Sequence, residues 1–215
     1  MRPNVIETGD ARILTEAIPD ASISLILCDP VYWNTDDYRW LGALAARVLS
    51  DGGALLAQVG EPFWYDAETA FRTGAAGALV HLTPIIEVFH FCTSGYRTGA
   101  TNFSSGYTPW LFATKGPRRC SVMNRFFGKR DKLHHRWGDG IHFAAKYVSV
   151  LTAPGDVVLD PFAGGGTVPA ACIMTGRTFY ACEIDPATAN AANERLAHAP
   201  RPLLTEAAPA QMALA

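Results

Sequence analysis

Two stretches of this sequence combine residue types that suit chemistry. The first is the motif DPVY, which begins at Asp29 and offers a carboxylate, a backbone carbonyl and an aromatic ring within four residues. The second is the run VVLDPFAGGGT, in which Asp160 precedes a glycine-rich turn, and Glu183 follows 19 residues after Gly164. Carboxylates accept hydrogen bonds from amines and hydroxyls, and glycines let a ligand approach the backbone closely. The sequence therefore predicts an acceptor-rich site and a nucleotide-type binding loop.

The glycine-rich turn lies between two predicted strands. Residues 157–159 and 178–182 are short apolar runs typical of buried parallel strands. Thr167 is placed to cap an intervening helix, and Gly176 stands where that helix should end. Strand, glycine loop, helix, strand and acid make up half of a doubly wound nucleotide site. An ordinary αβ turn with structural glycines would show the same pattern and is kept as the alternative.

The acids around this loop help to choose the cofactor. Glu183 suits the ribose hydroxyls of either a dinucleotide or S-adenosylmethionine. Asp160 closes the first strand, where a carboxylate attracts the ammonium group of a methionine moiety but repels a pyrophosphate. No Gly-Lys-Ser/Thr sequence follows the loop, which disfavours a P-loop. The sequence thus favours S-adenosylmethionine, with a dinucleotide-dependent oxidoreductase as a rival interpretation.

Both motifs resemble those of the S-adenosylmethionine-dependent DNA amino-methyltransferases. Residues 160–167, DPFAGGGT, resemble the family's DPFxGxGT cofactor motif, and DPVY resembles its D/N/S-P-P-Y/F/W catalytic motif. The catalytic motif comes first here, which is the order of the beta group of these enzymes. The resemblance extends from Val5 to Leu196, and Val31 stands where a second proline is usual.

The resemblance implies an α/β fold with a Rossmann-like doubly wound methyltransferase sheet, mostly parallel with an antiparallel strand, and a circularly permuted motif order. A single catalytic domain is expected over residues 1–198, and an alanine- and proline-rich flexible tail over residues 199–215. The length of 215 residues fits one large α/β domain. A composition of 49% hydrophobic and 18% charged residues is typical of a globular protein rather than a disordered chain.

Composition also bounds location and metal chemistry. No apolar run approaches the ~18 residues of a membrane-spanning helix, and the first ten residues lack a signal-peptide segment, so cytoplasmic residence is expected. Five cysteines form no CxxC pair, which argues against a disulfide framework or a zinc site, and no metal is assigned. Cys28, Cys172 and Cys182 are expected to be small buried residues of strands or helices.

The catalytic motif suits an exocyclic amine. The lone pair of such an amine is delocalised into the base, so hydrogen-bond acceptors must draw its hydrogens out of the ring plane. Asp29 supplies one acceptor and the Pro30 carbonyl a second, while Tyr32 and Trp33 offer aromatic faces to a base that has left the duplex. Val31 removes one fixed backbone angle, so reduced rigidity is expected. The alternative is a strand-ending turn with an aromatic plug.

Further cofactor residues follow from the resemblance. Asp10 resembles the carboxylate that accepts from the adenine amino group, although it also suits a helix N-cap. The sequence HFAAKY at residues 142–147 resembles the family's HPxxKP element, which flanks the methionine end of the cofactor, so Lys146 is a candidate or else a surface lysine. The predicted cofactor-binding residues are Asp10, Lys146, Asp160, Phe162, Gly164, Gly166, Thr167 and Glu183.

A basic segment separates the two motifs. Between Lys115 and Arg136 the charge is +7, while the whole chain carries −2. Such a segment on an acidic body is typical of a nucleic-acid contact region, although a solvated loop without a partner is the alternative. The resemblance places target recognition here, so DNA is the expected partner, double-stranded with the base flipped. The predicted contacts are Arg118, Arg119, Arg125, Lys129, Arg130, Lys132 and Arg136.

The remaining elements are predicted from local patterns. Strands are expected over residues 4–7, 23–28, 54–59, 85–92 and 110–114, and helices over residues 11–14, 35–49, 67–76 and 186–196. The sequence DGG at residues 51–53 is expected to stop the helix that begins at Thr35. Residues 95–109 are expected to form a polar connection, and residues 115–140 to be irregular.

Adenine N6 is the preferred predicted target. The aspartate that opens the catalytic motif favours adenine, because cytosine-amine enzymes of the family more often open with serine. Two alternatives remain, a cytosine-N4 DNA methyltransferase and a catalytically impaired DNA-binding relative. The sequence leaves open the recognition site, RNA activity and whether the protein is a homodimer.

Overall fold

The computed structural model describes residues 1–79, 83–89, 96–97, 104–105, 107–117, 125–128 and 141–199. Its strands are β1 (Ile6–Thr8), β2 (Ile23–Cys28), β3 (Leu49–Gln58), β4 (Thr83–Phe89), β5 (Tyr96–Arg97), β6 (Ser104–Ser105), β7 (Tyr107–Thr114), β8 (Arg125–Gly128), β9 (Val157–Asp160) and β10 (Thr178–Glu183). Its helices are α1 (Ala11–Leu14), α2 (Thr35–Val48), α3 (Trp64–Ala75), α4 (Ile141–Leu151), α5 (Thr167–Thr175) and α6 (Pro186–Ala197), with 3₁₀ turns η1 (Thr15–Ala17) and η2 (Glu61–Phe63).

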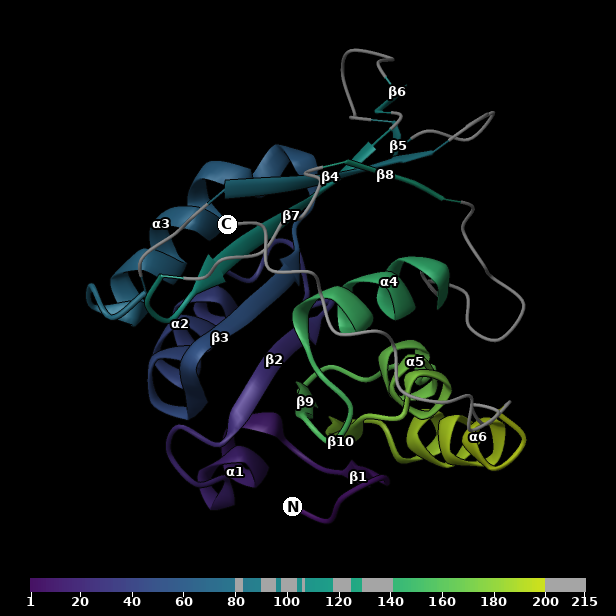
Figure 1. Cartoon of the computed structure of the whole chain (residues 1–215). Helices are drawn as coiled ribbons and strands as arrows, with labels where there is room; N and C mark the ends of the chain where they lie inside the picture. Colours follow the sequence, from purple (N-terminus) through teal and green to yellow (C-terminus); the bar gives the residue numbers. More distant parts are fainter. Residues whose placement is uncertain are drawn as a thin grey trace, which may run out of the picture.

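An eight-stranded sheet organises the described part of the chain, with the order β1-β10-β9-β2-β3-β7-β4-β8. The five strands from β1 to β3 are mutually parallel, and β7 runs antiparallel to both β3 and β4. Helices α1, α2 and α3 cover one face and α4, α5 and α6 the other (Figure 1). The prediction of a mostly parallel, doubly wound sheet with an antiparallel strand is confirmed.

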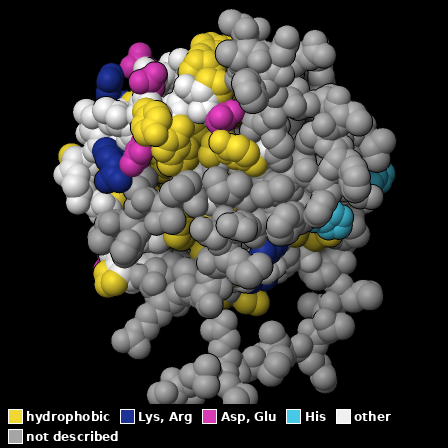
Figure 2. All heavy atoms as spheres, turned by 90° about the horizontal axis from the view of Figure 1, so that it is seen from above, with side chains coloured by type: hydrophobic (Ala, Val, Ile, Leu, Met, Phe, Trp, Pro, Cys, Tyr) yellow, Lys and Arg dark blue, Asp and Glu magenta, His cyan; other side chains and the backbone are white. Residues whose placement is uncertain are grey.

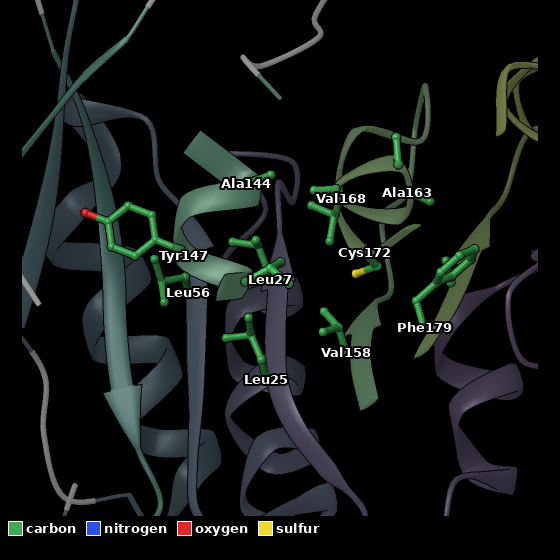
Figure 3. Close-up of a cluster of buried hydrophobic side chains, with 14 of the residues drawn as sticks. Leu25, Leu27, Leu56, Ala144, Tyr147, Val158, Ala163, Val168, Cys172 and Phe179 are labelled. Carbon is green, nitrogen blue, oxygen red and sulfur yellow. The ribbon is translucent and has the colours of Figure 1, made fainter. Parts of the chain in front are cut away.

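The central strand β2 is buried on both faces. Leu25 and Leu27 pack towards α4 and α5, whereas Ile26 and Cys28 pack towards α2 and α3. Figure 3 shows the first of these clusters, in which Leu25, Leu27 and Leu56 of the sheet share one apolar core with Tyr147 of α4. Because each fully buried leucine or isoleucine contributes about 1.5–3 kcal/mol, the strand that carries Asp29 is firmly anchored.

Two glycines allow α2 and α3 to approach closely. A Cβ atom on Gly42 would lie 2.2 Å from the Phe71 carbonyl oxygen, and one on Gly74 would lie 1.8 Å from the Arg39 carbonyl oxygen. Helix α2 itself begins after Asn34, whose side chain accepts a hydrogen bond from the Asp36 amide. This close contact fixes the helix that leads directly out of the DPVY motif.

Several predicted boundaries are wrong, and β3 shows why. It begins at Leu49 and runs through residues 51–53, which were expected to stop a helix as a loop. The Gly52 amide donates to the Lys115 carbonyl at 2.7 Å, and the Lys115 amide donates to the Gly53 carbonyl at 2.9 Å. Pairing with the chain after β7 therefore overrides the local turn signal.

Other corrections are smaller. Helix α3 begins at Trp64 instead of residue 67, β7 includes residues 107–109 of the expected polar connection, and β8 lies inside the segment expected to be irregular. Strand β1 begins at Ile6, because Asn4 has a positive φ of 60° and its amide donates to the Phe179 carbonyl.

The three cysteines that the structure describes are free and buried, as predicted: Cys28 in β2, Cys172 in α5 and Cys182 in β10. Among the described residues, none of the helices is long and apolar enough to cross a membrane. The expected tail lies outside the described residues apart from Ala199.

Candidate active site

Four neighbouring strands end with polar residues at one edge of the sheet. Strand β2 lies between β9 and β3 in parallel pairing, and β10 pairs in parallel with β9. Their carboxyl ends carry, in spatial order, Glu183, Asp160, Asp29 and Gln58. Open α/β sheets bind ligands at this edge. The two sequence motifs, which are more than a hundred residues apart, therefore emerge from adjacent strands.

The glycine-rich turn after β9 has two distinct glycines. Gly164 adopts a left-handed φ of 47°, and a Cβ atom there would meet nothing within 4 Å, so its outer side is open to a ligand. Gly166 has a φ of 78°, and a Cβ atom there would come within 3.2 Å of the Ile6 side chain. Arg195 of α6 donates to the Gly165 carbonyl at 2.8 Å and holds the turn from behind.

The predicted cap of α5 is wrong in one position. The helix begins at Thr167, and Gly166 is its N-cap, with no side-chain hydrogen bond at the cap. A glycine takes the cap position because its left-handed φ is needed to turn the chain into the helix. Gly176 ends α5 with a φ of 71°, as predicted.

Glu183 is oriented by backbone amides of two loops. The Gly164 amide donates to its Oε2 atom at 2.9 Å, and the Asp185 amide donates to its Oε1 atom at 3.0 Å. A carboxylate oxygen accepts more than one hydrogen bond, so both atoms keep capacity for the two hydroxyls of a ribose. The next residue, Ile184, has 71% of its surface exposed and was missed in the sequence, although an apolar residue directly after the acid was the available signal.

Asp160 is a buried acid with little polar support. It is only 2% exposed, and the Phe162 amide donates to its Oδ1 atom at 3.1 Å. Burial raises the pKa of Asp160 to about 8; the Phe162 amide lowers it in part, and the charge of Glu183 raises it further. A bound cation would favour the carboxylate form, as expected of a site for an ammonium group.

Asp10 lies at the start of α1 next to the end of β10. Its side chain accepts from the Arg12 amide at 2.8 Å, which makes it the N-cap of that helix. The preceding Gly9 amide donates to the Glu183 carbonyl at 3.0 Å. Asp10 is thus brought to the side of the glycine loop on which Glu183 lies.

The DPVY motif leaves β2 with its acid partly covered. Asp29 is partly buried, and its Oδ1 atom lies beneath the surface. Pro30 is buried, whereas Trp33 has 69% of its surface exposed. The side chain of Tyr32 lies against Gly60, since a Cβ atom on Gly60 would come within 3.0 Å of the Tyr32 Cβ and Cδ2 atoms.

Gln58 was not identified in the sequence as a site residue. Its Nε2 atom donates to the Tyr32 hydroxyl, and its backbone carbonyl accepts from the Tyr38 hydroxyl at 2.7 Å. The available signal was a single amide side chain within the otherwise apolar run of residues 54–59. The structure thus adds Gln58 to the candidate catalytic residues around the DPVY motif.

A second missed group ties the two motifs together. Arg12 pairs with Asp37 of α2 at 2.7 Å and lies 5.8 Å from the ring centroid of Trp40. The Trp40 ring in turn meets Phe162 edge-on at 5.9 Å between centroids. Burial raises the pKa of Asp37, an effect that the charge of Arg12 and the Asn34 amide partly offset. This cluster joins α1, α2 and the cofactor loop.

The remaining predicted residues are placed in part. Lys146 lies within α4, with its ammonium 5.6 Å from the Tyr147 ring centroid. The backbone of Arg125 lies in β8. The contacts predicted at Arg118, Arg119, Lys129, Arg130, Lys132 and Arg136 lie outside the described residues and stay predictions. Within the described ranges, His, Cys, Asp and Glu form no group of three that could hold a metal ion.

Known proteins are similar to this chain in sequence and fold. The type II methyltransferase M.Cfr9I of Citrobacter freundii is 38% identical over 258 aligned positions, which cover 87% of this chain and 86% of the relative. The chain belongs to the N6/N4 DNA methylase family. The sequence model of that family, DNA methylase, matches residues 140–194.

Two solved structures extend the comparison. TTHA0409 of Thermus thermophilus, assigned as a DNA modification methylase and solved with S-adenosyl-L-methionine, is 25% identical with a TM-score of 0.72, covering 90% of this chain and 93% of its own. The PvuII DNA methyltransferase, which is cytosine-N4-specific, has a TM-score of 0.75 at 13% identity and covers 89% of each chain, which shows a common fold. As a member of the N6/N4 DNA methylase family, the chain is a DNA methyltransferase.

Proposed function

We propose that this protein transfers a methyl group from S-adenosylmethionine to the exocyclic amine of a DNA base, with adenine N6 as the preferred target. The observation that carries the proposal is the adjacency of β2 and β9, which brings the DPVY motif and the glycine loop to one edge of the sheet. Residues 1–198 would form one catalytic domain. DNA methyltransferase activity follows from the family, and the choice of adenine is the proposal's own.

The residues present fit the cofactor. Gly164 leaves open space at the loop, and Glu183 is already oriented to accept from ribose hydroxyls. Asp160 would pair with the methionine ammonium group, and the exposed Ile184 would contact an aromatic ring system. Asp10, Phe162, Gly166, Thr167 and Lys146 complete the proposed cofactor-binding set. When bound, S-adenosylmethionine supplies an electrophilic methyl group on a sulfonium.

The chain's own role at the target base is to prepare the amine. An Asp29 oxygen and the Pro30 carbonyl would each accept a hydrogen bond from the amine. These bonds draw electron density out of the ring and onto the amine nitrogen. Tyr32 would stack on the base, and Trp33, with most of its surface exposed, would offer a second aromatic face. A base reaches such a site only after it leaves the duplex.

The basic segment between the motifs would hold the DNA. Its charge of +7 suits neutralisation of phosphates, which gives affinity without sequence preference. Exposed apolar side chains also occur close to the motifs, including Val31, Trp33 and Ile184. Figure 2 shows hydrophobic side chains gathered with both acidic and basic ones on the described part of the upper face. That face would depend on the basic segment for its attraction to DNA.

The choice between adenine and cytosine rests on Asp29. The PvuII enzyme acts on cytosine N4, and its likeness to this chain is one of fold alone. The fold therefore accommodates either amine. Cytosine-amine enzymes of the family more often open this motif with serine, so the aspartate at position 29 favours N6.

Methyl transfer with product identification tests the proposal. Labelled S-adenosylmethionine would be incubated with the protein and PCR-amplified DNA, which carries no methyl groups, and the nucleosides separated by mass. N6-methyladenine is expected. N4-methylcytosine alone would refute the adenine target. Cofactor binding by calorimetry without any transfer to DNA would instead indicate the impaired DNA-binding relative.

A further inference from the structure

We propose that Gln58 is a positioning residue that holds Tyr32 in place for stacking on the target base. This inference rests on the proposed role of Tyr32 in methyl transfer. The two side chains come from different strand ends, and the Gln58 Nε2 atom donates to the Tyr32 hydroxyl. The bond restrains the ring at its far end, opposite its attachment to the backbone.

The burial of Gln58 indicates that this side chain serves to position Tyr32 and does not stabilise the fold. The residue is 1% exposed, and in the described part of the structure its Oε1 atom is buried and accepts no hydrogen bond. A buried amide oxygen left without a partner costs about 1–3 kcal/mol. The three preceding residues and Val59 are apolar, so an apolar side chain at position 58 would suit the strand without that cost.

The backbone of Gln58 is fixed independently of its side chain. Its carbonyl accepts from the buried Tyr38 hydroxyl of α2, and Gln58 pairs with Trp110 in the ladder between β3 and β7. The amide group is therefore presented from a rigid strand end. A support of this kind holds a side chain more accurately than a loop would.

Val31 explains why the support is needed. A proline there would fix one backbone angle immediately before Tyr32, whereas valine leaves that angle free. The side chain of Val31 is exposed and contributes little packing. A hydrogen bond to the Tyr32 hydroxyl would restore, from β3, part of the order that the motif lacks.

Rate measurements test the role of Gln58. Gln58→Met keeps the length of the side chain but removes the hydrogen bond, and we expect kcat for methyl transfer to PCR-amplified DNA to fall about tenfold. KM for S-adenosylmethionine should not rise, and the melting temperature should not fall. The matched control, Leu56→Met, puts the same side chain two residues earlier in β3 and should keep wild-type kcat. Full kcat in Gln58→Met overturns the inference.

Two combinations separate positioning from general damage. Tyr32→Phe keeps the ring and removes the same hydrogen bond, so Tyr32→Phe with Gln58→Met should be no slower than Tyr32→Phe alone. Val31→Pro should restore most of the rate lost in Gln58→Met. Additive losses in the first pair, or no recovery in the second, would contradict a shared function in ordering Tyr32.

A spectroscopic measurement works without any DNA. In protein containing 3-fluorotyrosine, the Tyr32 fluorine resonance can be assigned by its loss in Tyr32→Phe. We expect Gln58→Met to shift and broaden that resonance. If the wild-type protein methylates no DNA but the resonance shifts, the proposed function fails while Gln58 still holds Tyr32. An unchanged resonance overturns the inference, whatever the activity.

Discussion

The proposed cofactor end and the proposed catalytic end of the site are built in different ways. At the cofactor end, backbone amides of Gly164 and Asp185 donate to the Glu183 carboxylate, and all three residues belong to one contiguous unit of strand, loop, helix and strand that ends at the N-cap of α6. At the catalytic end, Tyr32 is held by Gln58, which is 26 residues away in sequence and on another strand. One end is thus a local motif, and the other depends on how the sheet assembles.

This difference implies that the two ends respond differently to mutation. Changes at the cofactor end should alter binding of S-adenosylmethionine, because its contacts exist before DNA arrives. Changes at the catalytic end should alter the rate of transfer while leaving cofactor binding intact. The Arg12, Asp37 and Trp40 cluster, which meets Phe162, is where the two ends would communicate.

The largest effect is expected from Asp29→Ala. Loss of the acceptor should lower kcat by roughly 10²–10⁴-fold, the usual contribution of a side chain that acts on a reacting proton. Calorimetric affinity for S-adenosylmethionine should stay within about twofold of wild type, a difference well below 1 kcal/mol. Asp51→Ala, an exposed acid at the beginning of β3, is the matched control and should change neither value. Weak cofactor binding in Asp29→Ala would show that the two ends are not separable.

A smaller effect is expected from Glu183→Gln, and it should appear in cofactor affinity instead of kcat. Removal of the charge weakens hydrogen bonds to the ribose, so Kd for S-adenosylmethionine should rise about 10- to 100-fold, equivalent to roughly 1.4–3 kcal/mol. With saturating cofactor, kcat should recover most of its wild-type value. Glu194→Gln on the exposed side of α6 serves as the control. A loss of kcat that excess cofactor cannot recover would contradict the division between the ends.

Asp160 should make cofactor binding depend on pH. Its raised pKa of about 8 means that the free protein holds a proton there at neutral pH, which must leave when the carboxylate pairs with an ammonium group. Affinity should therefore rise with pH, by up to about tenfold per unit, until it stops rising near pH 8, where the ammonium group also begins to lose its proton. Asp160→Asn should remove this slope, as calorimetry between pH 6 and 9 would show. A slope that persists would assign the titration to another group.

The same shift fixes the sign of the effect on stability. The folded protein binds a proton at Asp160 over a range in which the unfolded chain, with an ordinary aspartate pKa, has released it. Its contribution to the free energy of unfolding is present in full below the unfolded pKa and is lost as pH rises to about 8. Chemical denaturation of wild type and Asp160→Asn should diverge in that direction.

The smallest expected effect is on stability alone. Gly74→Ala would place a methyl group against the Arg39 carbonyl and force α2 and α3 apart, costing about 1–3 kcal/mol despite the better helix propensity of alanine. Denaturant unfolding would measure the loss. Thr73→Ala, on the exposed side of the same helix, should change stability by less than about 0.5 kcal/mol. Equal free energies of unfolding for Gly74→Ala and wild type would mean that α2 and α3 can move apart at no cost.

The sequence predicted the strand, glycine loop, helix and strand of the proposed cofactor end because these elements are contiguous in the chain. The apolar run of β9, the glycines with left-handed φ and the acid at the end of β10 lie in one segment of about thirty residues, where spacing carries the geometry. The parallel sheet followed from the same pattern. The predicted N-cap of α5, Thr167, was wrong by one position. The left-handed φ of Gly166 makes that residue the N-cap.

The catalytic end was predicted only as a motif. Gln58 lies in the apolar run predicted as a strand over residues 54–59, and Arg12 and Asp37 lie in two separate predicted helices, so no local pattern marked them as site residues. Their contacts join residues 25 or more positions apart, and no local pattern encodes such pairs. The extension of β3 through Gly52 had the same cause, since its partner is Lys115 beyond β7.

A crystal structure with S-adenosylmethionine tests most directly whether the ends of β9 and β2 form one reaction site. We expect the ribose on Glu183, the ammonium group near Asp160, and the methyl-bearing sulfur directed towards Asp29 and Tyr32. A cofactor bound elsewhere, or one whose sulfur points away from the DPVY motif, would contradict the account.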